Sequence, residues 1–143
     1  MTQYCDTAPG APPEAHGFGC TPEECLALLR DLRRIPGLEI GFHLDVGHAR
    51  NNSPYSTLHP VGAWYGALGA ACNGMHLHQV CADERGGLHN HLPLEGLFDG
   101  LVSLASLVLA RRDGLLRRAP MFVEVRGGGE SSVRALRAAV SAG

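Results

Sequence analysis

The sequence contains no lysine, and all 12 of its basic side chains are arginines. This absence excludes enzymes that form a Schiff base on a lysine and nucleotide-binding proteins that use a P-loop lysine. A C-x-x-C pair is also missing, because the five cysteines are scattered at positions 5, 20, 25, 72 and 81. An odd, scattered set predicts neither a disulfide framework nor a zinc ribbon. We expect mostly reduced, structural cysteines.

Long apolar runs are absent as well. The longest, residues 101–110, is broken by two serines and is shorter than the roughly 20 residues that cross a bilayer. The chain opens without a basic start or an apolar stretch, so we expect no secretory leader and a cytoplasmic location. Twelve basic against 14 acidic residues give a net charge of -2, which does not favour a nucleic-acid partner. A length of 143 residues fits one domain.

Apolar periodicity and breaker residues predict an alternation of helices and strands. Residues 1–20 are rich in proline and glycine and form an expected arm, followed by a domain over residues 21–143. Expected helices cover residues 21–35, 60–71, 93–112 and a final stretch from Ser131 or Ser132, and expected strands cover residues 40–46, 74–80 and 121–125. Residues 82–90 are expected to form a polar loop. This order predicts an α/β fold with right-handed βαβ units and a parallel sheet.

The start of the first helix has a specific signature. Thr21 is an expected N-cap, Pro22 occupies the first helical position, and Glu24 follows three residues after the cap. This arrangement is a capping box, in which the two side chains satisfy backbone N–H groups reciprocally.

Polar side chains with metal-binding chemistry stand where the strands are expected to end. Asp45 and His48 follow the first strand, His76 and His78 lie in the second, and Glu124 lies in the third. Because the carboxyl ends of parallel strands meet at one rim, these groups are expected to converge. Two carboxylates and an imidazole make a nitrogen and oxygen ligand set suited to a divalent metal ion. His76 and His78 lie two residues apart, so either or both can face the site.

The same residues can also be explained by structural roles that involve no metal ion. A buried Glu124 flanked by apolar residues needs a metal ion, an arginine partner such as Arg126, or an open cleft. Asp45 with Gly47 is also typical of a strand-to-loop turn. Taken alone, His43, His59 and His78 are more simply explained as hydrogen-bonded core or surface residues.

Four motifs in order resemble the carboxyl-terminal half of the xylose-isomerase-like TIM-barrel superfamily. They are Leu44-Asp45-Val46-Gly47-His48-Ala49, Met75-His76-Leu77-His78, His91-Leu92-Pro93-Leu94 followed by Gly96, and Val123-Glu124-Val125. The superfamily includes sugar isomerases and epimerases and endonuclease IV-like enzymes. The resemblance implies a partial (β/α)8 barrel of three to four βα units.

The resemblance also implies roles for individual residues. Its metal ligands are Asp45, His76, Glu124 and His91, its catalytic residues are Glu124, Glu14 and His48, and its substrate-binding residues are His48, His89 and Arg85. His48 is implied either as a substrate contact or as a ligand of a second metal ion. The implied cofactor is a divalent ion such as Mn, Mg, Zn or Co.

The function that follows is a metal-dependent isomerase or epimerase of a small sugar or related polyhydroxy compound, working by proton transfer through an enediolate. The chain departs from the family, among other points, in the proline-rich stretch before Glu14 and in its length, because 143 residues are little over half of a barrel of about 250. A second copy or a missing barrel half is therefore the expected partner. The alternatives are a non-catalytic, truncated half-barrel that binds metal or dimerises, and, less favoured, an endonuclease IV-like phosphodiesterase.

Overall fold

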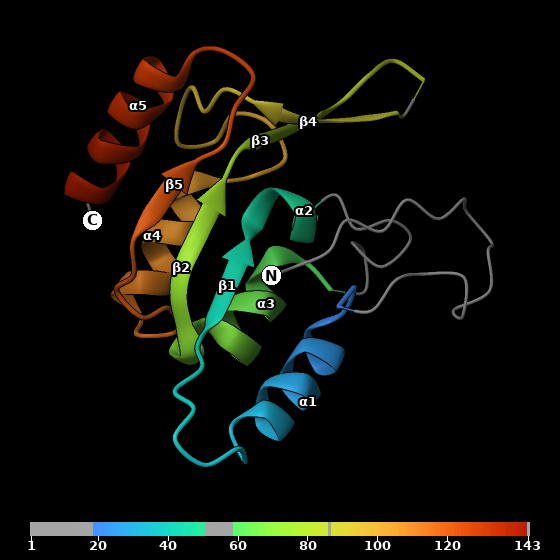
Figure 1. Ribbon diagram of the computed structural model, residues 1–143. Coiled ribbons are helices and arrows are strands. Elements are labelled where there is room, and N and C mark those ends of the chain that lie inside the picture. The colour runs from blue at the N-terminus through green and yellow to red at the C-terminus, as the bar shows by residue number, and fades with distance from the viewer. Residues whose placement is uncertain (1–18, 51–58, 86, 143) are drawn as a thin grey trace.

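A computed structural model describes residues 19–50, 59–85 and 87–142 of the chain. Five helices, one 3-10 turn and five strands are found in these ranges (Figure 1). In chain order they are α1 (Pro22–Leu32), β1 (Phe42–Asp45), α2 (Val46–Arg50), α3 (Val61–Leu68), η2 (Gly69–Ala71), β2 (Cys72–Leu77), β3 (Gln79–Ala82), β4 (Leu88–Leu92), α4 (Leu104–Arg112), β5 (Met121–Val123) and α5 (Gly129–Ser141).

The predicted parallel sheet is confirmed. It has three strands in the order β1-β2-β5, and both pairings are parallel. In this register Asp45 lies opposite His76, and His76 lies opposite Phe122. The hydrogen bond from the Glu124 N–H to the Leu77 carbonyl, at 3.0 Å, carries the β2–β5 ladder one residue beyond β5. The three strand ends are thereby aligned.

The two faces of this sheet differ sharply. Leu44, Met75 and Leu77 are fully buried and belong to the hydrophobic core, together with residues of α3 and α4. These two helices lie behind the sheet in the view of Figure 1. Because side chains alternate along a strand, the other face carries His43, Asp45, His76, Phe122 and Glu124. No described helix covers this second face, where Phe122 is 52% exposed.

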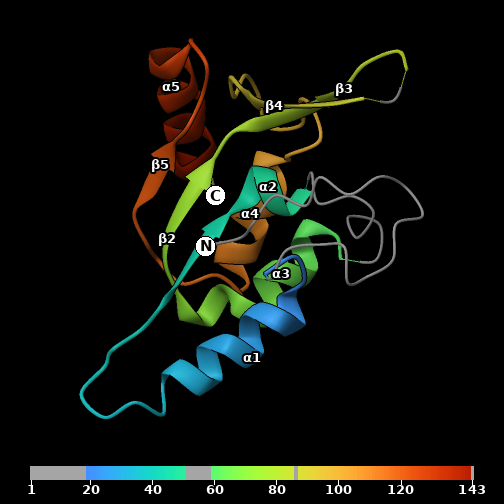
Figure 2. The ribbon, with the colours of Figure 1, turned by 45° about the vertical axis from the view of Figure 1, so that its right-hand side comes forward.

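The structure differs from the prediction in the second strand and in the loop after it. The strand is interrupted at His78, and β3 pairs with β4 as an antiparallel hairpin where a polar loop was expected. Asp83 holds the turn: its Oδ1 accepts hydrogen bonds from the Arg85 and Gly87 N–H groups at 2.9 and 2.8 Å. An aspartate that accepts backbone N–H groups is a strong turn former. The hairpin extends away from the parallel sheet (Figure 2).

The helix predicted over residues 93–112 is wrong in its first half, because α4 begins only at Leu104. The buried Gln79 side chain explains the difference. Its amide nitrogen donates to the Asp99 and Val102 carbonyls, and its oxygen accepts from the Val102 N–H at 2.7 Å. Backbone groups bonded in this way are withdrawn from helical bonding. Gly100, at φ 67°, also lies outside helical geometry.

Smaller boundary differences occur elsewhere. The first helix ends at Leu32 rather than Ile35, a short helix α2 follows β1 directly, and α5 starts at Gly129 behind the left-handed Gly128. Helix ends are the least predictable part of a sequence pattern. None of the described helices is both long and apolar enough to cross a membrane. The described strands form an open three-stranded sheet and a separate two-stranded hairpin, and no barrel.

The predicted N-cap of α1 is confirmed at Thr21, whereas the Glu24 side chain reaches past the cap residue to the two residues before it. Thr21 Oγ1 accepts from the Glu24 N–H at 3.3 Å, and Glu24 Oε2 accepts from the Gly19 and Cys20 N–H groups at 3.1 and 3.0 Å. The Thr21→Ala substitution is expected to lower the free energy of unfolding by about 1 kcal/mol, because it leaves a helix N–H without its acceptor. Urea unfolding measures this change. Thr21→Ser keeps the hydroxyl, so it should lose at most about half as much free energy of unfolding as Thr21→Ala. Equal losses in the two variants would contradict the capping role.

Candidate metal centre

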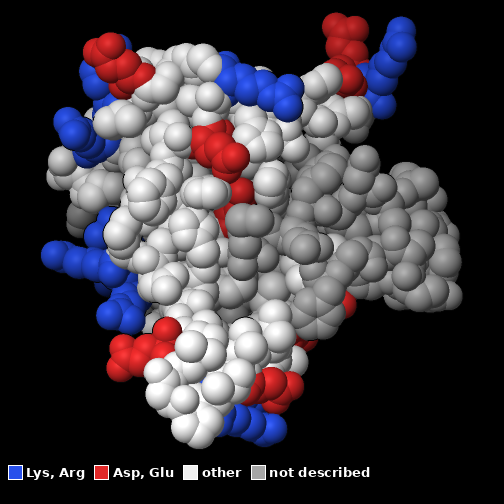
Figure 3. Space-filling model, viewed as in Figure 1, with Lys and Arg blue, Asp and Glu red and all other residues white. Residues whose placement is uncertain are grey.

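Asp45, His76 and Glu124 converge at the carboxyl ends of the three parallel strands. His76 Nδ1 lies 2.9 Å from Glu124 Oε2 and 3.7 Å from Asp45 Oδ2. One potential ligand atom from each residue lies within 4.8 Å of the others. Acidic side chains are visible at this end of the strands in Figure 3. The register of the sheet explains the convergence, since Asp45 and His76 are direct neighbours and Glu124 follows Phe122 on the same face.

Asp45 is the buried centre of this group, with only 1% of its surface exposed. Its Oδ1 accepts the His48 N–H at 2.8 Å, because α2 starts directly after the strand and turns that N–H back towards the carboxylate. Burial acts to raise the pKa of Asp45, but hydrogen bonds from His78 and His48 outweigh it, and the pKa lies below its ordinary value. The carboxylate is therefore ionised at neutral pH, as a metal ligand must be.

His48, His78 and His91 form a second group directly beside the first. Their potential ligand atoms also lie within 4.8 Å of one another. The His78 and His91 rings stack at 4.3 Å, and the His48 ring meets both edge-on, at 5.1 and 5.3 Å. Each group contacts the other, since His48 Nδ1 lies 3.2 Å from Asp45 Oδ2 and His91 Nε2 lies 3.7 Å from Glu124 Oε1.

His78 has a defined hydrogen-bonding role in this second group. It is fully buried, and its Nδ1 accepts the His91 backbone N–H at 3.0 Å. A neutral imidazole carries one proton, so that bond assigns the proton to Nε2. Nε2 lies 3.3 Å from Asp45 Oδ1, a long hydrogen-bond distance. In this tautomer His78 directs an N–H at Asp45, and it orients the carboxylate rather than binding a metal ion itself.

His91 is held in a strained backbone conformation. Its φ of 56° is the only positive value among the described non-glycine residues. The backbone is fixed from both sides, since its N–H donates to His78 and its carbonyl accepts from the Arg126 N–H at 2.7 Å. Strain of this kind is concentrated at functional sites, where the surrounding structure enforces it.

Two imidazoles in or beside the centre, those of His43 and His91, have lowered pKa values. Burial and the neighbouring His76 lower the pKa of His43, and burial and the neighbouring His78 lower the pKa of His91. A neutral imidazole offers a lone pair to a metal ion, whereas an imidazolium does not. His43 contacts His76 edge-on at 4.4 Å and stacks near Phe122 at 6.0 Å, so it borders the first group.

These lowered pKa values predict how the stability of the metal-free protein depends on pH. The unfolded chain takes up protons at His43 and His91 near pH 6.5, the ordinary histidine value, whereas the folded chain resists protonation. The contribution of these residues is present above pH 6.5 and is lost as the pH falls through their lower folded pKa values. Urea unfolding between pH 8 and pH 5, about the range where histidine titrates, measures it. The His43→Gln, His91→Gln double variant should lose less stability over that range than the wild type; an unchanged slope would contradict this assignment.

The structure brings together most of the predicted site residues, but it divides them between two groups in a way that differs from the prediction. Asp45, His76 and Glu124 form one group as predicted, while His91, predicted as their fourth ligand, belongs with His48 and His78. The alternative explanation of Glu124, a pairing with Arg126, is not among the ion pairs of the described residues. Glu14 lies outside the described residues.

Two predicted substrate-binding residues lie elsewhere. His89 and Arg85 stand on the β3–β4 hairpin, where His89 Nε2 lies 3.0 Å from Asp83 Oδ2 and the Arg85 N–H donates to Asp83. The prediction placed them in a loop that folds over the site. Residues two apart share one face of a regular strand, but the positive φ of His91 interrupts that geometry, so His91 faces the centre while the exposed His89 contacts Asp83.

His78 is the site residue that the sequence did not assign. Its two-residue spacing from His76 allowed both side chains to face the site, but the structural role was the simpler explanation for a lone histidine. One signal was the glycine two residues after Asp45, and the structure explains it, because a Cβ at position 47 would lie 2.0 Å from the His78 ring. Glycine is required there so that the imidazole can reach the carboxylate.

The donor set fits a divalent metal ion. Ligand atoms about 2.1 Å from one ion lie at most about 4.2 Å apart, so a separation within 4.8 Å closes with a small movement. Asp45 is ionised, and the Nε2–H of buried His78 is directed at its Oδ1, whereas its Oδ2 lies on the side of His76.

Comparison with known proteins adds no family to this description. No protein-family model matches the sequence, and no curated protein matches it. The resemblance to the xylose-isomerase-like superfamily therefore rests on the four strand-end motifs alone.

Proposed function

We propose that Asp45, His76 and Glu124 bind a divalent metal ion and that the site isomerises or epimerises a small sugar or related polyhydroxy compound. The observation that carries the proposal is the convergence of two carboxylates and an imidazole within 4.8 Å at the ends of three parallel strands. The His76 and Glu124 side chains are 30% and 46% exposed, so a small molecule can reach these two residues.

The bound ion would polarise neighbouring oxygen atoms of the substrate and so acidify the adjacent C–H group. Mixed carboxylate and imidazole ligands suit Mn, Zn or Co, and Mg in a more oxygen-rich setting. The adjacent His48 and His91 offer nitrogen atoms for a second ion or for substrate hydroxyl groups. Either use is compatible with the tautomer of His78, which leaves both neighbouring rings in place.

Asp45 and Glu124 differ in a way that divides their tasks. The Asp45 side chain is 2% exposed and bonded to the backbone of α2, whereas the Glu124 side chain is 46% exposed. Asp45 is therefore suited to holding the ion, and Glu124 is suited to removing a proton from a substrate carbon and returning it to the neighbouring carbon. Glu14 is the second acid–base group in this proposal.

We further propose that the sheet is part of a (β/α)8 barrel completed by a second copy of the chain or by a separate barrel half. The sheet has unpaired edges at β1 and β5 within the described residues. Unpaired parallel strands readily add another strand. The uncovered face carries His43, His76 and Phe122, which would point into the interior of such a barrel.

Deuterium exchange tests the proposed reaction. The chain, loaded with Mn or Zn, is incubated with a panel of aldoses and ketoses in heavy water, and deuterium at the carbon next to the carbonyl is followed by NMR. Glu124→Gln is expected to lower the exchange rate at least about 100-fold, because it removes the base but keeps the size of the side chain. His59→Gln is the matched control, since His59 contacts Glu23 at 3.7 Å, outside the centre.

Metal binding without exchange on any member of the panel would contradict the isomerase proposal. It would leave the alternative of a half-barrel that binds metal or dimerises without catalysis. Equal exchange in the wild type and Glu124→Gln would instead contradict the assignment of the base.

A further inference from the structure

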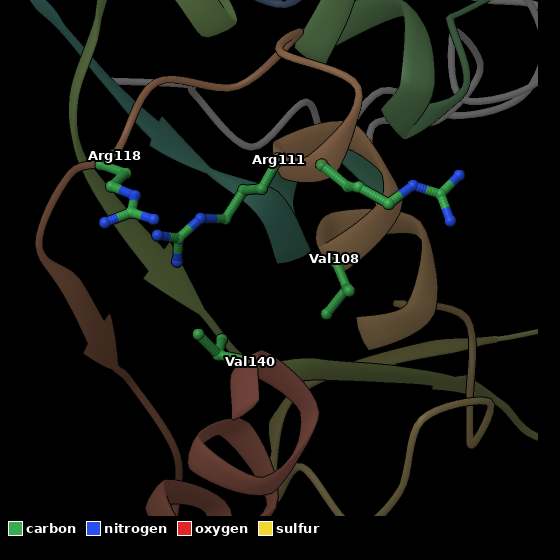
Figure 4. A pocket seen from close by; sticks show the side chains of 5 residues that line it. Val108, Arg111, Arg118 and Val140 are labelled. Atoms are coloured by element: carbon green, nitrogen blue, oxygen red, sulfur yellow. The ribbon is translucent and has the colours of Figure 1, made fainter. Parts of the chain in front are cut away.

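A cavity lies at the opposite end of the sheet from the metal centre. Its volume is about 170 Å³, and it is bounded by the last turns of α4 and α5 and by the segment that leads into β5. Its lining residues are Val108, Arg111, Arg112, Arg118 and Val140 (Figure 4). Arg118 precedes β5 whereas Glu124 follows it, so the length of the strand separates this cavity from the centre.

Two guanidinium groups face each other across this cavity. Arg111 extends from α4 and Arg118 from the segment before β5, and their side chains point towards one another (Figure 4). Neither forms an ion pair with a described carboxylate. Arg112 is different, because it turns aside and its Nε lies 3.0 Å from Asp113 Oδ1. Basic side chains gather along this edge of the molecule, beside β5, in Figure 3.

The dipole of α4 explains only part of this arrangement. Cations are favoured in the last turn of a helix, which accounts for Arg111 and Arg112. It does not account for Arg118, which belongs to no helix. Two like charges directed at the same space repel each other, the more so beside the apolar Val108 and Val140. An anion between the guanidinium groups would convert this repulsion into two attractive contacts.

A neighbouring hollow extends the site along α5. Its volume is about 380 Å³, it shares Arg111 and Val140 with the first cavity, and it adds Arg137, which also has no described carboxylate partner. Six of its nine lining residues are apolar, among them Met121, Val123 and Leu136. A ligand with an anionic head and an apolar body matches this pair of hollows. The flat guanidinium fork suits the oxygen atoms of a phosphate group.

We propose that this cavity is a binding site for a small phosphate-bearing molecule, with the phosphate between Arg111 and Arg118 and the organic part along the apolar hollow. None of its residues belongs to the metal centre. Phosphate binding at this site is therefore independent of the proposed isomerase activity.

Calorimetric titration of the full chain with inorganic phosphate and with phenyl phosphate tests the proposal. Saturable binding of both is expected, with the tighter affinity for phenyl phosphate because its ring enters the apolar hollow. Arg118→Gln and Arg111→Gln should each weaken binding at least about tenfold, since each removes a charged hydrogen-bond donor. Arg118→Lys should fall between the wild type and Arg118→Gln, because it keeps the charge and loses the fork.

Two controls separate this site from other sources of phosphate binding. Arg134→Gln removes a charge from α5 that is already paired with Glu130, and it should leave the affinity unchanged. Asp45→Asn disables the metal centre and should also leave it unchanged. If Arg111→Gln does not fold, Arg118→Gln decides, because Arg118 is exposed.

Several results would overturn the proposal. Two of them are the absence of saturable binding and an affinity that Arg118→Gln does not change. An equal loss of affinity in Arg134→Gln would indicate diffuse charge attraction. A loss of affinity in Asp45→Asn would place the phosphate at the metal centre.

Discussion

Asp45→Asn is expected to lower the affinity of the chain for divalent metal ions at least about 100-fold, more than the 10–100-fold typical when only an outer-shell partner is lost. Asp45 contacts members of both groups: its carboxylate oxygens lie 3.2 Å from His48, 3.3 Å from His78 and 3.7 Å from His76. Asparagine keeps the shape and still accepts the His48 N–H, so the fold should survive. The charge that attracts the ion is lost.

Metal content after equilibrium dialysis, measured by mass spectrometry of the elements, provides the test. Asp83→Asn is a matched control, because Asp83 also accepts backbone N–H groups and contacts a histidine, His89, but on the hairpin. This control should bind metal like the wild type. Asp45→Ala with His76→Ala should show no bound metal, and unchanged metal content in that double variant would defeat the metal-site account.

Gly47→Ala is expected to lower the free energy of unfolding by at least about 2 kcal/mol, at the upper end of what overpacking costs. A Cβ at position 47 would lie 2.0, 2.3 and 2.3 Å from three atoms of the His78 ring. His78 is fully buried and bonded to the His91 backbone, so the ring cannot simply turn away. Its displacement would also release Asp45 and His91, and metal affinity should fall with stability.

Gly66→Ala is the control for this substitution. Gly66 lies within α3, and a Cβ there would meet no atom within 4 Å. Alanine in a helix interior is about 0.5–1 kcal/mol more favourable than glycine, so this variant should be at least as stable as the wild type. Urea unfolding of both variants gives the comparison. If Gly47→Ala is as stable as Gly66→Ala, the close packing of Gly47 against His78 is not part of the native structure.

The sequence predicted the parts of the fold that depend on local patterns. The α1 cap, the three parallel strands and the position of Asp45, His76 and Glu124 at the strand ends all follow from local apolar periodicity and from the rule that parallel strand ends share one rim. Those features need no knowledge of distant contacts. They were accordingly predicted within a few residues.

The features that were missed depend on contacts between distant residues. The bonds of Gln79 to Asp99 and Val102 span some 20 positions, and they replace the helix that the periodicity of residues 93–112 predicts. Likewise, His78 approaches Asp45 only because the chain bends between β2 and β3. No local pattern encodes either contact, so the partition of the site into two groups appears only in three dimensions.

The proposed site requires a metal ion at the ends of β1, β2 and β5. Anomalous diffraction from crystals of the chain grown with Mn or Zn tests it most directly, because the peak marks the ion without reference to activity. We predict a peak about 2.1 Å from atoms of Asp45, His76 and Glu124. A crystal that shows ordered metal only elsewhere, for example at Asp83 and His89, or none at all at saturating metal, would contradict the account.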